Sequence, residues 1–148
     1  MLASVPASNM SVVVIETNVF VAALRSSGGA SRQVLRLVLH GRATPIFGNA
    51  LWNEYQEVLE RDLWTPTTSP TERLQVLAAL AQAGRWLSVY FAWRPNLPDE
   101  SDNHLIELAI AGHAHFIVTH NVRDLVRGEL AWPHLRVITP ALFLEEFQ

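Results

Sequence analysis

Short apolar runs alternate with longer amphipathic segments along this chain of 148 residues. The runs at 11–15 and 44–47 are rich in β-branched residues and carry no charge, which predicts strands that are buried on both faces. Further strands are expected where apolar residues recur in short runs or at every second position, at 87–93, 115–118 and 135–138.

Segments with helical spacing of apolar residues lie between these runs. In 49–62, for example, Leu51 and Tyr55 point in nearly the same direction at about 100° per residue. We expect Thr17 or Asn18 to cap the first helix, because both side chains can accept a hydrogen bond from the first turn. The pattern predicts helices at 19–24, 31–40, 49–62, 71–85 and 102–111, with a last helix that opens at Thr139 and Pro140.

Strands that alternate with helices are typical of a parallel sheet covered on both faces, so the expected fold class is α/β, an α/β/α sandwich. We expect one such domain over 11–148, preceded by a flexible tail over 1–10 that lacks the features of a signal peptide. Ligands of parallel sheets bind outside the carboxyl ends of the strands. Catalytic residues are therefore expected at that edge.

The amino-acid composition excludes several kinds of catalytic and binding site. The absence of cysteine excludes disulfides, thiolate metal sites and cysteine nucleophiles. All 11 basic residues are arginine, which excludes a P-loop and a receiver-type signalling site, since both use a lysine. The net charge of −3 argues against binding nucleic acid by bulk electrostatics, although arginines can form a local phosphate-binding patch. No apolar run reaches the roughly 20 residues that span a membrane, and a cytoplasmic protein is expected.

Two acidic residues stand at the predicted carboxyl edge. Glu16 directly follows the first strand, and Asp102 opens the helix 102–111 on the same face as Leu105. Each has a structural alternative, because an acidic residue at a helix N-terminus is also stabilised by the helix dipole or serves as a cap. The sequence leaves both interpretations open.

Two further acidic residues are candidates. Glu54 borders the apolar stripe of its helix, whereas Glu57 points away from it, and Glu54 could equally be a carboxylate on a solvated flank. Asp124 follows the strand 115–118, where it could bind a metal or reach back to cap a short helix that begins near Asn121.

Carboxylates that gather at one edge repel one another unless a cation compensates their charge. Hard ions such as Mg²⁺ and Mn²⁺ take oxygen ligands, and two of them about 3.5–4 Å apart can activate water and stabilise the leaving oxygen of a phosphodiester. No two histidines stand four residues apart, and no nucleophile elbow is present, so zinc and serine-hydrolase sites are not indicated. His104 and His120 lie near this edge and could contact phosphate, but the favoured interpretation is that they are exposed polar residues.

Four segments together resemble the PIN-domain family, in particular its branch of toxins from bacterial toxin–antitoxin systems. They are VVVIETNVFVAAL at 12–24, LWNEYQEVLER at 51–61, PDESDNHLIELAIAGHAHFIVTHNVRDL at 98–125 and VITPALFL at 137–144. The resemblance implies a PIN-like parallel sheet between helices and an endoribonuclease that depends on Mg²⁺ or Mn²⁺. It also implies an RNA substrate, an antitoxin protein as partner and a homodimer.

The resemblance assigns roles to individual residues. Acidic residues at the family's catalytic positions would bind the metal or orient its waters, and these are Glu16, Glu54, Asp102 and Asp124. Polar residues would line the pocket, and these are Thr17, Asn18, Thr119, Asn121 and Arg123. Arg123 would guide RNA to the metals, or else belong to an exposed basic face.

The chain departs from the family pattern at Glu16, where the family has aspartate. The additional methylene displaces the carboxylate by the order of 1 Å, and a misplacement of about 1 Å can reduce a rate roughly a hundredfold. Glu16→Asp is therefore expected to raise cleavage. The alternative to an active nuclease is a catalytically impaired PIN-like module that binds RNA or protein.

Overall fold

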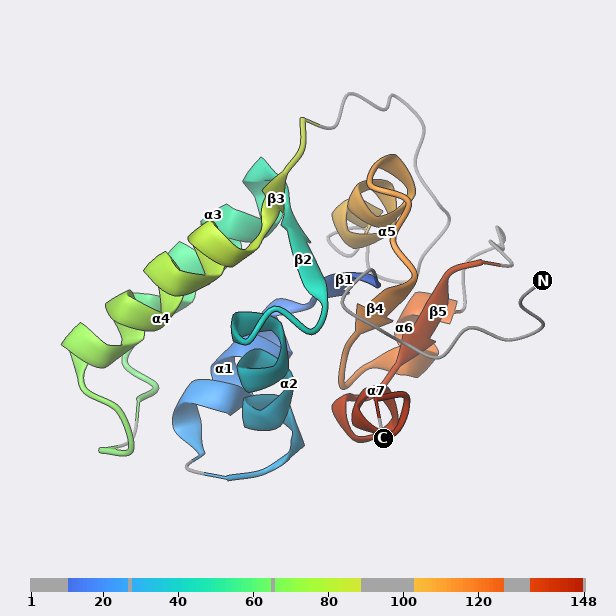
Figure 1. The fold of residues 1–148 in the computed structure, drawn as a ribbon. Coiled ribbons are helices and arrows are strands. Elements are labelled where there is room, and N and C mark those ends of the chain that lie inside the picture. The colour runs from blue at the N-terminus through green and yellow to red at the C-terminus, as the bar shows by residue number, and fades with distance from the viewer. Residues whose placement is uncertain (1–10, 27, 65, 89–102, 127–133, 148) are drawn as a thin grey trace.

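The computed structural model describes residues 11–26, 28–64, 66–88, 103–126 and 134–147. Within these ranges five parallel strands form one sheet, in the order β3-β2-β1-β4-β5 (Figure 1). The strands are β1 (Val12–Ile15), β2 (Thr44–Phe47), β3 (Arg85–Trp86), β4 (Phe116–Val118) and β5 (Arg136–Ile138). The predicted α/β class with a parallel sheet is confirmed, and the strand order reverses at β1.

Helices connect the strands and cover both faces of the sheet. Helices α1, α2 and α7 pack together on one side, whereas α5 contacts β1, β2 and β4 from the other (Figure 1). Helices α3 and α4 lie side by side, and α3 contacts both α1 and α5. The helices of the described ranges are α1 (Thr17–Arg25), α2 (Ala30–Leu39), α3 (Asn49–Leu59), α4 (Pro70–Ala83), α5 (Asn103–Ala111), α6 (Val122–Val126) and α7 (Pro140–Glu145).

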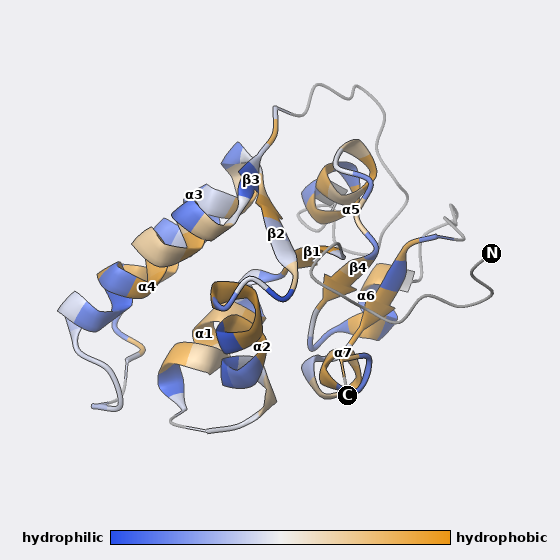
Figure 2. Cartoon of the chain, in the orientation of Figure 1, coloured by the Kyte–Doolittle hydropathy of each residue, from blue (hydrophilic) through white to orange (hydrophobic). Residues whose placement is uncertain are grey.

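The core lies on both faces of β1. Val13 and Val14 point to opposite faces, yet both are fully buried, as expected for the central strand of a covered parallel sheet. Figure 2 shows hydrophobic residues concentrated on β4, on α5 and on the inner faces of α1 and α2. Because β1 is held from all sides, the residue that follows it has a fixed starting position.

Strand β3 starts earlier than its apolar alternation indicated. The prediction that placed Arg85 in a helix and began the strand at Leu87 is wrong for the described residues. Helix α4 ends just before Gly84, which lies so close to β2 that a Cβ atom there would be 2.4 Å from Cε2 of Phe47. This close approach brings the chain into the sheet before the alternating residues begin. Residues 89–93 of the predicted strand lie outside the described ranges.

The first helix begins at Thr17, so the prediction that Thr17 or Asn18 caps it is wrong. Glu16 occupies the cap position with extended backbone angles, φ −65° and ψ 150°, and its side chain makes no capping hydrogen bond. The side chains of Thr17 and Asn18 are therefore available for contacts across the edge of the sheet.

Two other helix ends are set locally. Helix α3 ends at Leu59 and not at residue 62, because the N–H groups of Glu60 and Arg61 bond to carbonyls three residues earlier and tighten the last turn. Helix α7 begins as predicted, with Thr139 accepting a cap hydrogen bond and Pro140 at the first helical position.

The described residues contain no helix long and apolar enough to cross a membrane. The predicted flexible tail over residues 1–10 lies outside the described ranges. The expectation of one domain over 11–148 stays a prediction.

Candidate active site

The carboxyl ends of β1 and β4 meet at the centre of the sheet, where the strand order reverses. Ile15 pairs in register with Val118, so the residues that follow them, Glu16 and Thr119, come side by side. The backbone N–H of Glu16 donates to the carbonyl oxygen of Val118 with an N···O distance of 3.0 Å. Parallel sheets bind ligands in the crevice at such a reversal point. These two residues thus lie at the edge where the sequence analysis placed the catalytic residues.

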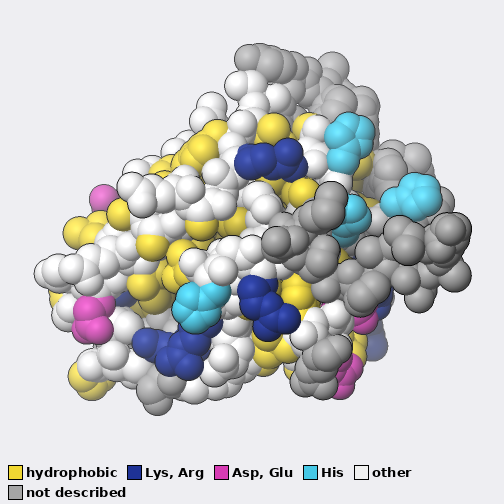
Figure 3. All heavy atoms as spheres, viewed as in Figure 1, with side chains coloured by type: hydrophobic (Ala, Val, Ile, Leu, Met, Phe, Trp, Pro, Cys, Tyr) yellow, Lys and Arg dark blue, Asp and Glu magenta, His cyan; other side chains and the backbone are white. Residues whose placement is uncertain are grey.

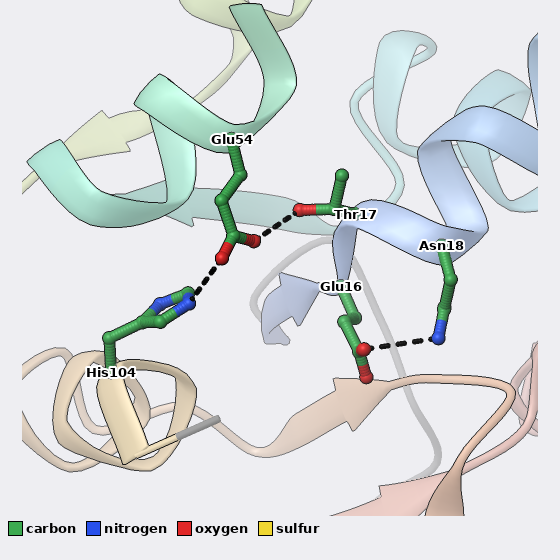
Figure 4. Close-up of polar contacts among 5 residues, drawn as sticks. All are labelled: Glu16, Thr17, Asn18, Glu54 and His104. Carbon is green, nitrogen blue, oxygen red and sulfur yellow. Dashed lines mark hydrogen bonds and ion pairs between the residues drawn. The ribbon is translucent and has the colours of Figure 1, made fainter. Parts of the chain in front are cut away.

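The carboxylate of Glu16 is held at both oxygens, and Figure 4 shows the contact with Asn18. Its Oε1 accepts a hydrogen bond from Oγ1 of Thr119, and its Oε2 accepts one from Nδ2 of Asn18 at 3.0 Å. The side chain does not cap α1, although the residue stands at the N-terminus of that helix. Glu16 is therefore not a capping residue, while its place at the N-terminus of α1 leaves the helix-dipole alternative open.

Thr119 and Asn18 connect this carboxylate to the loop after β4. Thr119 is fully buried, and its Oγ1 also accepts a hydrogen bond from the backbone N–H of Asn121 at 2.9 Å. Oδ1 of Asn18 accepts a longer bond, 3.4 Å, from the backbone N–H of His120. The hydroxyl and amide that orient Glu16 are thus themselves oriented by backbone groups.

Glu54 extends from α3 toward the same edge (Figure 4). Its Oε1 accepts a hydrogen bond from Oγ1 of Thr17 at 2.6 Å, and its Oε2 lies 2.9 Å from Nε2 of His104 on α5. Burial alone would raise the pKa of Glu54, but the hydrogen bonds from His104 and Thr17 and the charge on His104 outweigh it, so the pKa is lowered. Glu54 is therefore a carboxylate at neutral pH and not a carboxylic acid.

Tyr55 fixes the helix that carries Glu54. Its hydroxyl donates to the carbonyl oxygen of Ile15 at 2.5 Å, and its ring stacks on Phe20 with centroids 4.4 Å apart. Tyr55 is fully buried, and its pKa is raised first by burial and then by the negative charges of Glu54 and Glu16. Tyr55 thus lies close enough to both carboxylates for their negative charges to add to the effect of burial on its pKa.

The structure gives fewer contacts for the other two predicted acidic residues. Asp102 lies outside the described residues, and α5 begins at the residue after it. Asp124 lies half-buried in the first turn of α6, where its backbone N–H donates to the carbonyl oxygen of Asn121 at 3.1 Å. Arg123 and Asn121 are exposed. In the part of the chain that the structure describes, no three histidine or acidic side chains form a group that could hold a metal ion.

The donor atoms at this edge nevertheless fit a hard divalent cation. The carboxylates of Glu16 and Glu54 offer oxygen, the ligand type that Mg²⁺ and Mn²⁺ prefer. The negative charge that raises the pKa of Tyr55 is the charge that such a cation would compensate. Two carboxylates come from the described residues, and the predicted ligand Asp102 lies outside them.

A comparison with known families matches residues 12–123 to the PIN domain. The chain belongs to the PIN-domain family. The match covers more than half of the chain and runs from β1 into α6, so it includes Glu16, Glu54 and Thr119 and ends one residue before Asp124. The resemblance seen in the sequence is confirmed. Membership of the family indicates that the chain is a nuclease, since PIN domains are typically metal-dependent nucleases.

This PIN domain is also similar in fold to a solved structure of VapBC2 from Rickettsia felis bound to a DNA fragment from their promoter. The TM-score is 0.57 at 14% sequence identity, and the similarity covers 86% of this chain and 98% of the other. At this identity the likeness shows the fold alone. No significant match is found among curated proteins.

Sequence reasoning missed two residues that build this site. His104 was expected to be an exposed polar residue, but it is half-buried against Glu54, and Tyr55 was assigned only to an apolar stripe. The signal for His104 is its place in the most specific segment of the family resemblance, two residues after Asp102. Nothing local indicates that α3 and α5 face each other, which is why the pair with Glu54 could not be found.

Proposed function

We propose that this PIN domain is a metal-dependent endoribonuclease that hydrolyses RNA phosphodiester bonds, and that it is the toxin of a toxin–antitoxin pair. The observation that supports this most strongly is the pair of oriented carboxylates, Glu16 and Glu54, at the point where the strand order reverses. Membership of the PIN-domain family supports the nuclease, and the oxygen donors support the metal.

The proposed roles of the individual residues follow the resemblance to the PIN-domain family. Glu16 and Asp102 bind Mg²⁺ or Mn²⁺ directly, whereas Glu54 and Asp124 bind the metal or orient its waters. When bound, the metal would act as a Lewis acid and would lower the pKa of the water that attacks phosphorus. Residues that shape the pocket by hydrogen bonding are Thr17, Asn18, Thr119 and Asn121, and Arg123 guides the RNA.

The protein's own contribution is to hold these charges in place before substrate arrives. Thr119 and Asn18 restrict Glu16 to one orientation, and Thr17 and His104 do the same for Glu54. The stacked rings beneath the edge exclude water from that side. A site whose side chains are already oriented loses little entropy on binding metal and RNA.

Partners are proposed on two grounds. The R. felis assembly of the same fold is VapBC2, solved on DNA from their promoter, which supports an antitoxin partner for this chain as well. A homodimer and a cytoplasmic location follow from the family resemblance.

A binding module without turnover is the second candidate, and the contacts of Glu16 favour it. Both carboxylate oxygens of Glu16 already accept hydrogen bonds from protein groups, and the side chain is one methylene longer than the family's aspartate. In that case the protein would hold RNA or a partner protein and cleave poorly.

The deciding experiment is digestion of a mixed RNA panel by the purified protein with Mg²⁺ or Mn²⁺. EDTA and Asp102→Asn are the negative controls, and Asp62→Asn, an exposed acid beyond the end of α3, is the matched control. Cleavage that requires both the metal and Asp102, and that survives Asp62→Asn, supports the nuclease. Intact RNA with a folded protein, together with metal-independent binding of RNA, supports the module.

A further inference from the structure

A groove opens next to the carboxylates and runs along α1. Its cavity volume is about 710 Å³, and Thr17 and Asn18 line the end nearest the site. These two residues are the ones that donate to Glu54 and Glu16, so the groove and the site share a wall. Any ligand that lies in the groove reaches the carboxylates without leaving the surface.

The two walls of the groove end in arginines. Along α1, Asn18, Val21, Ala22 and Arg25 are spaced by three or four residues and share one face, which extends about 10 Å from the site. On the opposite wall Val58 stands one turn after Glu54, and Arg61 follows the end of α3.

The charged residues that line the groove are the two arginines, and the carboxylates of Glu54 and Glu16 lie just beyond its other end, bonded to Thr17 and Asn18. Arg25 and Arg61 are both exposed. Arg61 also pairs with Glu57 at 2.8 Å, and this bridge lies on the surface, where water screens it and a phosphate can replace it. Arginine matches phosphate geometry with two parallel N–H donors.

The floor between these ends is apolar, with contributions from Val21, Ala22 and Val58. A cationic groove is typical of surfaces that bind single-stranded nucleic acid, because its charged groups follow the phosphates. Here the aliphatic floor offers apolar contact to bases and riboses, although it has no aromatic ring on which a base could stack.

We propose that this groove binds the single-stranded segment of RNA that flanks the bond to be cut, with Arg25 and Arg61 contacting its phosphates. The proposal rests on the function proposed above, because it takes the carboxylates as the cleavage site. It explains how a chain of net charge −3 binds a polyanion, since the two arginines lie where the flanking phosphates pass.

The test is the affinity of the full chain for a fluorescein-labelled single-stranded RNA, measured by anisotropy in EDTA at several salt concentrations. Each phosphate contact of a single strand contributes roughly 0.7 to the slope of log affinity against log salt. Arg25→Gln with Arg61→Gln should therefore lower the slope by about 1.4. The matched control is Arg36→Gln with Arg85→Gln, which removes the same charge from exposed positions outside the groove and should leave the slope unchanged.

A pair of opposite substitutions in the floor tests position independently of total charge. Ala22→Arg should tighten RNA binding and Ala22→Glu should weaken it, while the same two changes at Ala78, exposed on α4, should differ little from each other. Circular dichroism checks that every variant is folded.

The outcomes separate this proposal from the proposed function. If the salt dependence of RNA affinity falls only in the groove variants, the groove is supported as the RNA-binding site. This holds even if neither the wild type nor any variant cleaves RNA. Metal-dependent cleavage with the same slope in groove and control variants overturns the groove and leaves the nuclease standing. In that second case the apolar floor would indicate a protein segment as its occupant.

Discussion

The two edges of the sheet both carry polar side chains, but they use them differently. At the carboxyl edge Glu16 and Glu54 bond to side chains that come from other elements. At the amino edge a pocket of about 380 Å³ beside α5 is lined by three histidines and by apolar residues. Figure 3 shows histidine side chains at the surface on this side of the molecule. The three histidines are His113, His115 and His134.

In the histidine pocket, the contact of His115 has a structural role. Nδ1 of His115 accepts a hydrogen bond from the backbone N–H of Val12 at 3.0 Å, so the ring completes the start of β1 and carries its proton on Nε2. At the carboxyl edge the side chains face one another over the end of the sheet. Of these two clusters, the one whose described side chains bond to one another across elements is therefore that of the carboxyl edge.

The largest expected effect is that of Glu16→Gln. The substitution keeps the shape but removes the charge that would hold a metal, and metal contributions to a transition state are several kcal/mol, or about a thousandfold in rate. We expect RNA cleavage to fall by about that factor. Glu60→Gln, exposed at the end of α3, is the matched control and should cleave normally. Equal cleavage by both variants would remove Glu16 from the site.

Glu16→Asp tests the length of the same side chain. We expect cleavage to rise, by up to roughly a hundredfold, because the family's aspartate brings the carboxylate back by about 1 Å. Initial rates measured side by side with wild type are the readout. An equal or lower rate would mean that the contacts with Thr119 and Asn18 have made this pocket suited to glutamate.

Thr119→Val removes a hydroxyl while it keeps the side-chain volume. Groups that orient a metal ligand typically contribute about 10–100-fold to metal affinity or activity, and we expect a loss in that range. Metal affinity by calorimetry and cleavage rate should fall together. Thr44→Val at the start of β2 is the matched control at the amino edge, and a similar loss there would contradict a local role for Thr119.

His104→Leu tests the second carboxylate by its pKa. We expect the pKa of Glu54 to rise, because the variant loses the histidine hydrogen bond and charge while burial remains. Carbon-detected NMR titration of the Glu54 carboxyl measures this directly, and an unchanged pKa would contradict the pair. Because the folded pKa is lowered, Glu54 stabilises wild type above its ordinary pKa, and that stability is lost as pH falls through the folded pKa. The loss is small, since its side chain is 39% exposed and screened by water.

The smallest effects are expected at the amino edge. His115→Ala loses one exposed backbone hydrogen bond and should lower the free energy of unfolding by about 0.5–1 kcal/mol, measured by urea denaturation. His113→Ala and His134→Ala should change neither stability nor cleavage appreciably. Loss of cleavage in any of the three would break the distinction between the two edges.

Much of this fold was predictable from the sequence because its signals are local. The β-branched run of β1, the apolar run of β4 and the Thr139-Pro140 start of α7 indicate their own structure through backbone preference and burial. The alternation of these strands with helices is sufficient to predict a parallel sheet. The carboxyl edge of that sheet is then the expected place of the site. The start of β3 was missed because a non-local contact, Gly84 against Phe47, determines it.

The candidate site also has a part that the sequence predicts and a part that only tertiary packing determines. The sequence by itself determined that acidic residues follow β1 and border α3, and it did so through position along the chain. Only the tertiary structure decided what they contact: Thr119 reaches Glu16 because β1 and β4 pair in register, and His104 reaches Glu54 because α3 packs beside α5. Such pairs join residues about 50 to 100 positions apart. Packing of the whole chain selects them, and no local preference encodes them.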